Sequence, residues 1–149
     1  MKTQIKDLYH GVALTQIVEH PSYKALNKAS SKYGHYLVNQ DREVFTKYRT
    51  KATRARRPLW HFTFQPDEVS AVYDAVARGQ HVFVCLICAD KTVCLLDSAD
   101  FSALLKKDQP QSQYVRVSSP KGTSCRVSST FHDLDHVIPH KAFPEAIFR

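Results

Sequence analysis

The chain has little glycine: four residues in 149, beside one methionine and one tryptophan. Loops that cradle phosphate groups depend on closely spaced glycines, and neither a G-x-G-x-x-G pattern nor a P-loop occurs. The G-x-S-x-G nucleophile elbow of many hydrolases is missing as well. The sequence therefore argues against a nucleotide-hydrolysing or dinucleotide-binding enzyme, and it predicts no bound cofactor.

Long apolar runs are also scarce. The longest, Val82 to Ala89, is far shorter than the ~20 residues that span a bilayer. Lys6 and Asp7 interrupt the stretch in which a signal peptide needs an apolar segment. Without a secretory segment, four cysteines do not indicate a disulfide framework. We expect a soluble, cytoplasmic protein with reduced thiols and no membrane partner.

The composition is that of a folded domain, because 43% of the residues are hydrophobic and 11% are aromatic. The length predicts one globular domain over residues 1–149, large enough to bury a core of its own. The net charge of +7 is concentrated in one place. Residues 41–57 contain seven basic and two acidic side chains, so the rest of the chain is nearly neutral.

Apolar periodicity predicts helices and strands that alternate along the chain. Helices are expected at residues 5–20, 21–34 and 66–79, and after Asp97 or Ser98. In the first of them the apolar stripe consists of Ile5, Leu8, Val12, Ile17 and Val18. Strands are expected at residues 35–39, 44–48, 59–64, 81–89, 92–96, 114–117 and 124–129. The predicted class is α/β or α+β, a mixed β-sheet flanked by helices in the order αα-βββ-α-ββ-α-ββ, with an irregular tail from Phe131.

The basic run predicts a nucleic-acid-binding surface. Lys47, Arg49 and Lys51 are spaced by two, so a strand places them on one face. Arginine binds phosphate through a forked set of donors, and aromatic rings stack on bases. The predicted contact residues are Lys47, Tyr48, Arg49, Lys51, Arg54, Arg56, Arg57 and Trp60, and Arg116, Lys121 and Arg126 are candidates to extend the surface.

Two other interpretations of the basic run stay open. A charged loop keeps an otherwise neutral protein soluble without binding anything. The same cations also suit an acidic protein partner, which makes the chain a protein-interaction or regulatory module.

Two carboxylates near the basic run suggest an enzyme alternative. Asp41, Glu43 and Lys47 are all at odd positions, so a continuous strand places them on one side. The two acids can bind a divalent ion, and the lysine can offset the negative charge that develops during phosphodiester cleavage. The order helix, three strands, helix, strand over Ile5 to Ala89 resembles the restriction-endonuclease-like fold. That resemblance implies a metal-dependent nuclease with an acid on one strand and an acid-x-Lys triplet on the next.

The sequence departs from that pattern. Its triplet, Phe45-Thr46-Lys47, lacks the acid, and the expected strand 59–64 has neither acid nor lysine. Glu19 on the first helix is an additional carboxylate. A binding protein is therefore favoured over a divergent nuclease.

Cysteines and histidines at two places in the sequence have spacings that occur in metal sites. Cys85 and Cys88 have the C-x-x-C spacing, but positions three apart on a strand point to opposite faces. They are expected to be small buried hydrophobes. The histidines at 132, 136 and 140 repeat every four residues, so a metal site that includes Cys125 and ordinary surface histidines are both open.

Overall fold

The computed structural model describes residues 2–53, 59–119, 122 and 124–149 as an α+β domain with two β-sheets. The first, sheet A, has the order β1 (Leu26–Lys28), β2 (His35–Val38), β3 (Arg42–Arg49), β5 (His81–Cys88) and β6 (Thr92–Asp97). It is mixed, because β3 and β5 run parallel while the other pairs are antiparallel. The second, sheet B, has the order β4 (Leu59–Phe64), β7 (Gln113–Ser118), β8 (Ser124–Ser129) and β9 (Ile138–Pro139) and is antiparallel.

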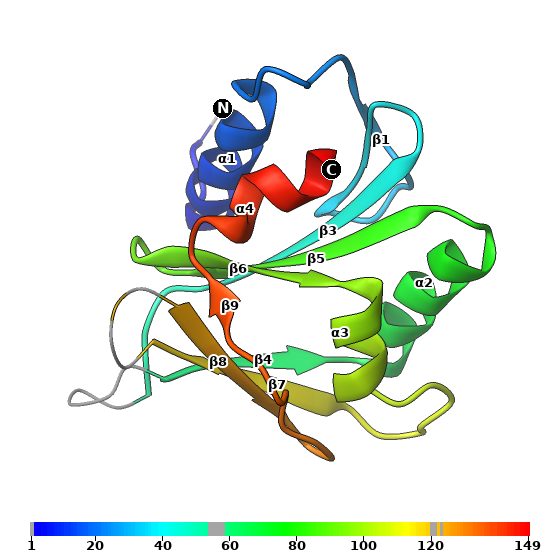
Figure 1. Ribbon diagram of the computed structural model, residues 1–149, viewed down its shortest axis with the longest axis vertical. Coiled ribbons are helices and arrows are strands. Elements are labelled where there is room, and N and C mark those ends of the chain that lie inside the picture. The colour runs from blue at the N-terminus through cyan, green and yellow to red at the C-terminus, as the bar shows by residue number, and fades with distance from the viewer. Residues whose placement is uncertain (1, 54–58, 120–121, 123) are drawn as a thin grey trace.

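The two faces of sheet A have different covers, as Figure 1 shows. The helix α1 (Ile5–Val18) lies on one face with α4 (Ala142–Glu145) and the short 3-10 helix η1 (Ala146–Phe148). The helices α2 (Pro66–Ala77) and α3 (Ser98–Leu104) lie on the other face together with sheet B. Sheet A therefore separates two hydrophobic cores.

The strand β5 is buried from both sides. Cys85 belongs to the core under α1 and Cys88 to the core against sheet B, so the predicted opposite orientation of this pair is confirmed. Both are free thiols, and burial raises their pKa. They act as small core residues.

Local capping signals predicted α2 and α3 correctly. Pro66 opens α2, and the Glu68 carboxylate accepts a hydrogen bond of 2.9 Å from the Gln65 backbone N–H. At the start of α3 the Asp97 carboxylate accepts a hydrogen bond of 2.8 Å from the Asp100 backbone N–H. These interactions lie within a few residues of each other, so a sequence pattern contains them.

The predicted helix at residues 21–34 is wrong. After α1 ends, the chain turns and forms β1, which pairs with β2. Gly34 is not a helix terminus. It has a φ of +80°, and a Cβ at this position would lie 2.7 Å from the Thr46 carbonyl oxygen. Glycine is needed here because the backbone passes close to β3.

The expectation of one sheet is also wrong. Leu59–Phe64 does form a strand, β4, but it pairs with β7 in sheet B and not with β3. The tail is more regular than predicted. It contains β9, α4 and η1, which pack Phe143 and Ile147 into the core under α1.

The orientation of α1 differs from the prediction. Its buried residues are His10, Ala13 and Ile17, whereas Ile5, Leu8, Val12 and Val18 are exposed. Of the helices that the described residues form, none is long and apolar enough to cross a membrane.

Candidate functional site

The strand β3 presents its side chains alternately to the two covers of sheet A. Glu43 and Lys47 lie on the face of α2, because Glu43 binds Arg78 at the end of that helix and Lys47 binds Glu68 in its first turn. Thr46 and Tyr48 lie on the face of α1. The common face of Glu43 and Lys47 follows from the pleat of a strand.

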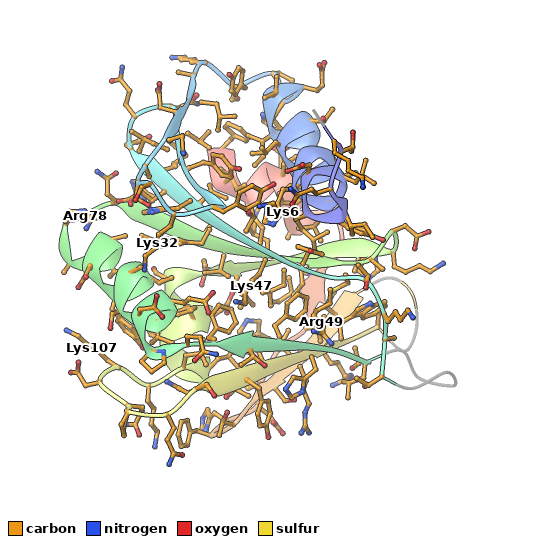
Figure 2. The ribbon with its side chains drawn as sticks, turned by 180° about the vertical axis from the view of Figure 1, so that it is seen from behind. Lys6, Lys32, Lys47, Arg49, Arg78 and Lys107 are labelled. Atoms are coloured by element: carbon orange, nitrogen blue, oxygen red, sulfur yellow. The ribbon has the colours of Figure 1, made fainter. Side chains whose placement is uncertain are left out.

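The basic residues of this strand differ in how far their charge is compensated. Lys47 is half-buried, forms an ion pair with Glu68 and lies 5.0 Å above the centre of the Phe64 ring. Arg49 ends β3 and is exposed, as is Lys51 just beyond it. Figure 2 shows Lys47 and Arg49 along the same strand. The predicted contacts Arg54, Arg56 and Arg57 lie outside the described residues.

The two aromatic residues predicted to stack on bases do not face solvent freely. Tyr48 lies under α1, where its ring stacks on Tyr9 with centroids 5.5 Å apart. Trp60 is only 3% exposed and belongs to the core between the sheets. Its indole N–H is, within the described residues, the one buried side-chain nitrogen or oxygen without a hydrogen-bond partner. The Trp60 ring is therefore covered by the core, and stacking on bases at this residue stays a prediction.

Different rings occupy the surface of sheet B. Along β4, Trp60 and Phe62 point inward, so His61 and Thr63 point outward. Tyr114 on β7 faces outward beside His61, with ring centroids 5.0 Å apart. The alternation of apolar and polar residues over positions 60–64 is the sequence signal that selects His61 over Trp60 for the surface.

Cations from two sheets surround His61. Arg116 lies directly opposite His61 in the pairing of β4 with β7. Burial lowers the pKa of His61, and the charges of Arg116 and Arg49 lower it further. The charges of Arg49 on sheet A and Arg116 on sheet B therefore both act on the His61 ring.

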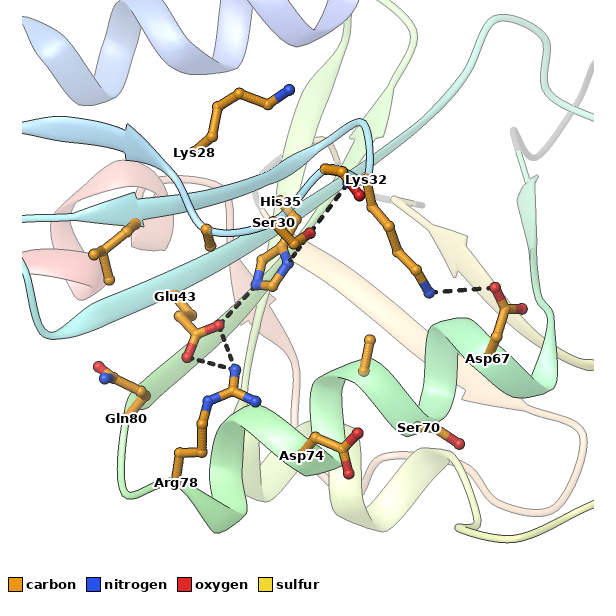
Figure 3. Close-up of a pocket in the computed structure, with 14 residues that line it drawn as sticks. Lys28, Ser30, Lys32, His35, Glu43, Asp67, Ser70, Asp74, Arg78 and Gln80 are labelled. Carbon is orange, nitrogen blue, oxygen red and sulfur yellow. Dashed lines mark hydrogen bonds and ion pairs between the residues drawn. The ribbon is translucent and has the colours of Figure 1, made fainter.

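A separate cavity of about 730 Å³ opens between α2 and the segment that joins β1 to β2. Figure 3 shows Ser30, His35, Glu43 and Arg78 linked across it. Ser30 Oγ and His35 Nδ1 are 2.9 Å apart, and His35 Nε2 lies 2.8 Å from Glu43 Oε1. Arg78 donates to both oxygens of Glu43, at 2.8 and 3.0 Å. The cavity wall is thus a hydrogen-bonded chain from a hydroxyl to a guanidinium.

Two of the residues suggested for a metal-dependent nuclease, Asp41 and Glu43, already form ion pairs with other side chains. Glu43 is committed to His35 and Arg78, and Asp41 forms an ion pair with its neighbour Arg42. Glu19 is an exposed residue at the end of α1. In the part of the chain that the structure describes, no three His, Cys, Asp or Glu side chains form a group that could hold a metal ion.

The tail histidines do not converge either. His136 lies between Asp135 and Asp100, at 2.8 Å from each, and these hydrogen bonds raise its pKa. His140 is bonded to Ser119 at 2.9 Å, and His132 is exposed. The three histidines have different surroundings, so they do not point to one common site.

Comparisons with known proteins add no relative: no family model, no curated protein and no solved structure matches the chain. The resemblance to the restriction-endonuclease-like fold stays a prediction. Four strands lie between α1 and α2: β1, β2 and β3 belong to sheet A, and β4 belongs to sheet B.

Proposed function

We propose that this protein binds nucleic acid, with phosphate contacts made by the cations around the end of β3. The observation that supports this most directly is the position of two arginines: Arg49 is exposed at the end of β3, and Arg116 lies opposite His61 on sheet B. Lys51, exposed two residues after Arg49, adds a third positive charge. Uncompensated cations in one place attract a polyanion, and the guanidinium fork matches the phosphate group.

The charge of these three residues is available for a partner. Among the described residues, the ion pairs involve Lys47, Arg78 and others, but none involves Arg49, Lys51 or Arg116. Lys47, by contrast, is neutralised by Glu68 and contributes little to the net field. The binding cations are therefore Arg49, Lys51 and Arg116.

Fluorescence anisotropy with labelled DNA and RNA tests the proposal. Three phosphate contacts predict an affinity that falls roughly 20- to 40-fold between about 50 and 200 mM monovalent salt. Arg49→Met and Arg116→Met should each reduce the slope of log K against log salt by about 1. Lys107→Met, an exposed cation on a different part of the surface, is the control (Figure 2).

Two outcomes contradict the proposal. One is undetectable binding to duplex and single-stranded DNA and RNA at low salt. The other is an equal loss for Lys107→Met and Arg49→Met, which indicates unspecific attraction to a basic protein.

The alternative is an acidic protein partner that uses the same cations. Pull-down from a native lysate, with and without nuclease treatment, separates the two functions. A partner that Arg49→Met loses and nuclease does not remove favours the protein-interaction module. For the divergent nuclease, plasmid cleavage with Mg²⁺ or Mn²⁺ that Asp41→Ala abolishes is the result that supports it.

A further inference from the structure

The outer face of sheet B carries an unusual set of side chains for a surface. Its inner face packs Trp60, Phe62 and Val117 into the core. No described helix covers the outer face, which is the lowest layer of the molecule in Figure 1. The side chains that alternate with the core residues are Leu59, His61 and Thr63 on β4, Tyr114, Arg116 and Ser118 on β7, and Arg126 and Ser128 on β8.

Three flat groups adjoin one another on this face. The rings of His61 and Tyr114 lie 5.0 Å apart and are inclined by 32°. The Arg116 guanidinium lies 4.3 Å above the centre of the Tyr114 ring. All three side chains are partly exposed on the outer face. Partly exposed aromatic and guanidinium planes are groups on which a further flat group, such as a base, can stack.

The charges around the rings fit a polyanion. Arg126 is exposed and pairs with Ser118. Ser118 is two residues after Arg116 on β7, so Arg116 and Arg126 lie on the same face of the sheet. The charge of Arg49, at the end of β3 in sheet A, also lowers the pKa of His61. One acidic side chain, Asp133, lines a cavity of about 180 Å³ together with Arg116 and Arg126. Described cations thus outnumber the acid on this surface.

We propose that the outer face of sheet B is a stacking platform for unpaired bases, and that single-stranded nucleic acid is the class of ligand. Tyr114 and His61 stack on bases, while Arg116, Arg126 and Arg49 bind the phosphates. Sheet faces with aromatic rings and arginines recognise splayed single strands in this way, whereas a duplex keeps its bases stacked inside. The inference rests on the proposed function and adds the surface and the ligand class to it.

The decisive probe is a strand without bases. A fluorescent single strand of about twelve nucleotides is compared with an abasic strand of equal length, which keeps every phosphate. DNA and RNA forms of the normal strand and a DNA duplex are further arms. We expect the normal strands to bind roughly 5- to 100-fold more tightly than the abasic strand.

A variant pair isolates the ring. Tyr114→Leu should weaken binding of the normal strand by about fivefold or more and leave binding of the abasic strand unchanged. Tyr114→Phe keeps the ring and should keep the affinity. Tyr33→Leu, which removes another exposed tyrosine beside α1, is the matched control and should have no effect. Circular dichroism and thermal melting establish that each variant is folded.

The outcomes separate the two proposals. If normal and abasic strands bind equally with the expected salt dependence, the platform is overturned and phosphate binding stands. Equal affinity of Tyr114→Leu and wild type for the normal strand also overturns the platform. If no nucleic acid binds at all and only a protein is captured, both proposals are wrong.

Discussion

A buried histidine packs against each face of β3, and the two histidines have different hydrogen-bond partners. On the α1 face, His10 is bonded to the Thr46 hydroxyl and has tyrosine rings as neighbours. On the α2 face, His35 is bonded to the Glu43 carboxylate, which Arg78 also binds. Burial of a charge is costly unless the charge is paired. The α2 face, called the charged face below, pairs the Glu43 carboxylate with Arg78. The α1 face, called the neutral face, keeps His10 uncharged at neutral pH, because burial lowers its pKa.

The largest expected effect comes from breaking the charged face. Arg78→Met should lower the free energy of unfolding by about 2–3 kcal/mol, because the Glu43 carboxylate, only 5% exposed, loses its guanidinium partner and keeps only the bond with His35. Urea unfolding followed by circular dichroism measures this. Adding Glu43→Gln to Arg78→Met should recover part of the loss.

The control for this variant is Arg49→Met. Arg49 has no ion pair among the described residues, so its loss should change stability by less than about 0.5 kcal/mol. Equal effects of the two variants would contradict the structural role assigned to Arg78.

The second prediction concerns the neutral face and pH. Burial lowers the pKa of His10 from 6.5 to about 4, while Asp7 raises it and Lys6 lowers it by smaller amounts. Between these two values the unfolded chain binds a proton that the folded protein does not, so stability rises with pH. Lowering the pH from about 7.5 to 5 should therefore cost about 2 kcal/mol through His10.

The variant His10→Phe tests the origin of this dependence. The variant should lack the part of the pH dependence of stability that His10 causes, even if its stability at neutral pH differs from that of wild type. Urea midpoints at both pH values measure it for wild type, His10→Phe and the exposed control His132→Gln. An unchanged pH dependence in His10→Phe would assign the effect to other groups.

A smaller effect is expected for the second ion pair of the charged face. The side chains of Lys47 and Glu68 are 26% and 35% exposed, so solvent screens their interaction more than that of Glu43. Lys47→Met should lower stability by about 0.5–1 kcal/mol. A double-mutant cycle with Glu68→Gln measures the coupling; a value as large as that of Arg78 with Glu43 would contradict this ranking.

The smallest effect is expected on the outside of the neutral face. Leu8 is 58% exposed on α1, so Leu8→Ala should change the free energy of unfolding by no more than about 0.5 kcal/mol. Thermal or urea unfolding checks it. A loss above about 1.5 kcal/mol would mean that the exposed side of α1 is covered in solution.

Sequence patterns predicted the features that depend on near neighbours. Pro66 and Asp97 begin their helices as expected, and the parity of Cys85 and Cys88 assigns them to opposite faces. Parity also places Glu43 and Lys47 on one face. Each of these needs only the geometry of one element.

Long-range contacts account for what the patterns missed. Periodicity grouped Leu8 with Ile17, but it cannot say which side of α1 meets sheet A, and the side with His10 does so through Thr46. Leu59–Phe64 was correctly a strand, yet its sheet depends on pairing with β7, about fifty residues later. The basic surface was predicted on β3, and its continuation through Arg116 depends on that same pairing.

Trp60 gives this protein an optical probe of its own. It is the only tryptophan in the chain, and its indole is sealed in the core on the side of β4 opposite to His61. Its emission therefore reports the core between the sheets from a single position, without a label. A ligand that settles on the outer face leaves that emission unchanged as long as the sheet keeps its shape. Intrinsic fluorescence can thus distinguish occupancy of the surface from a rearrangement beneath it.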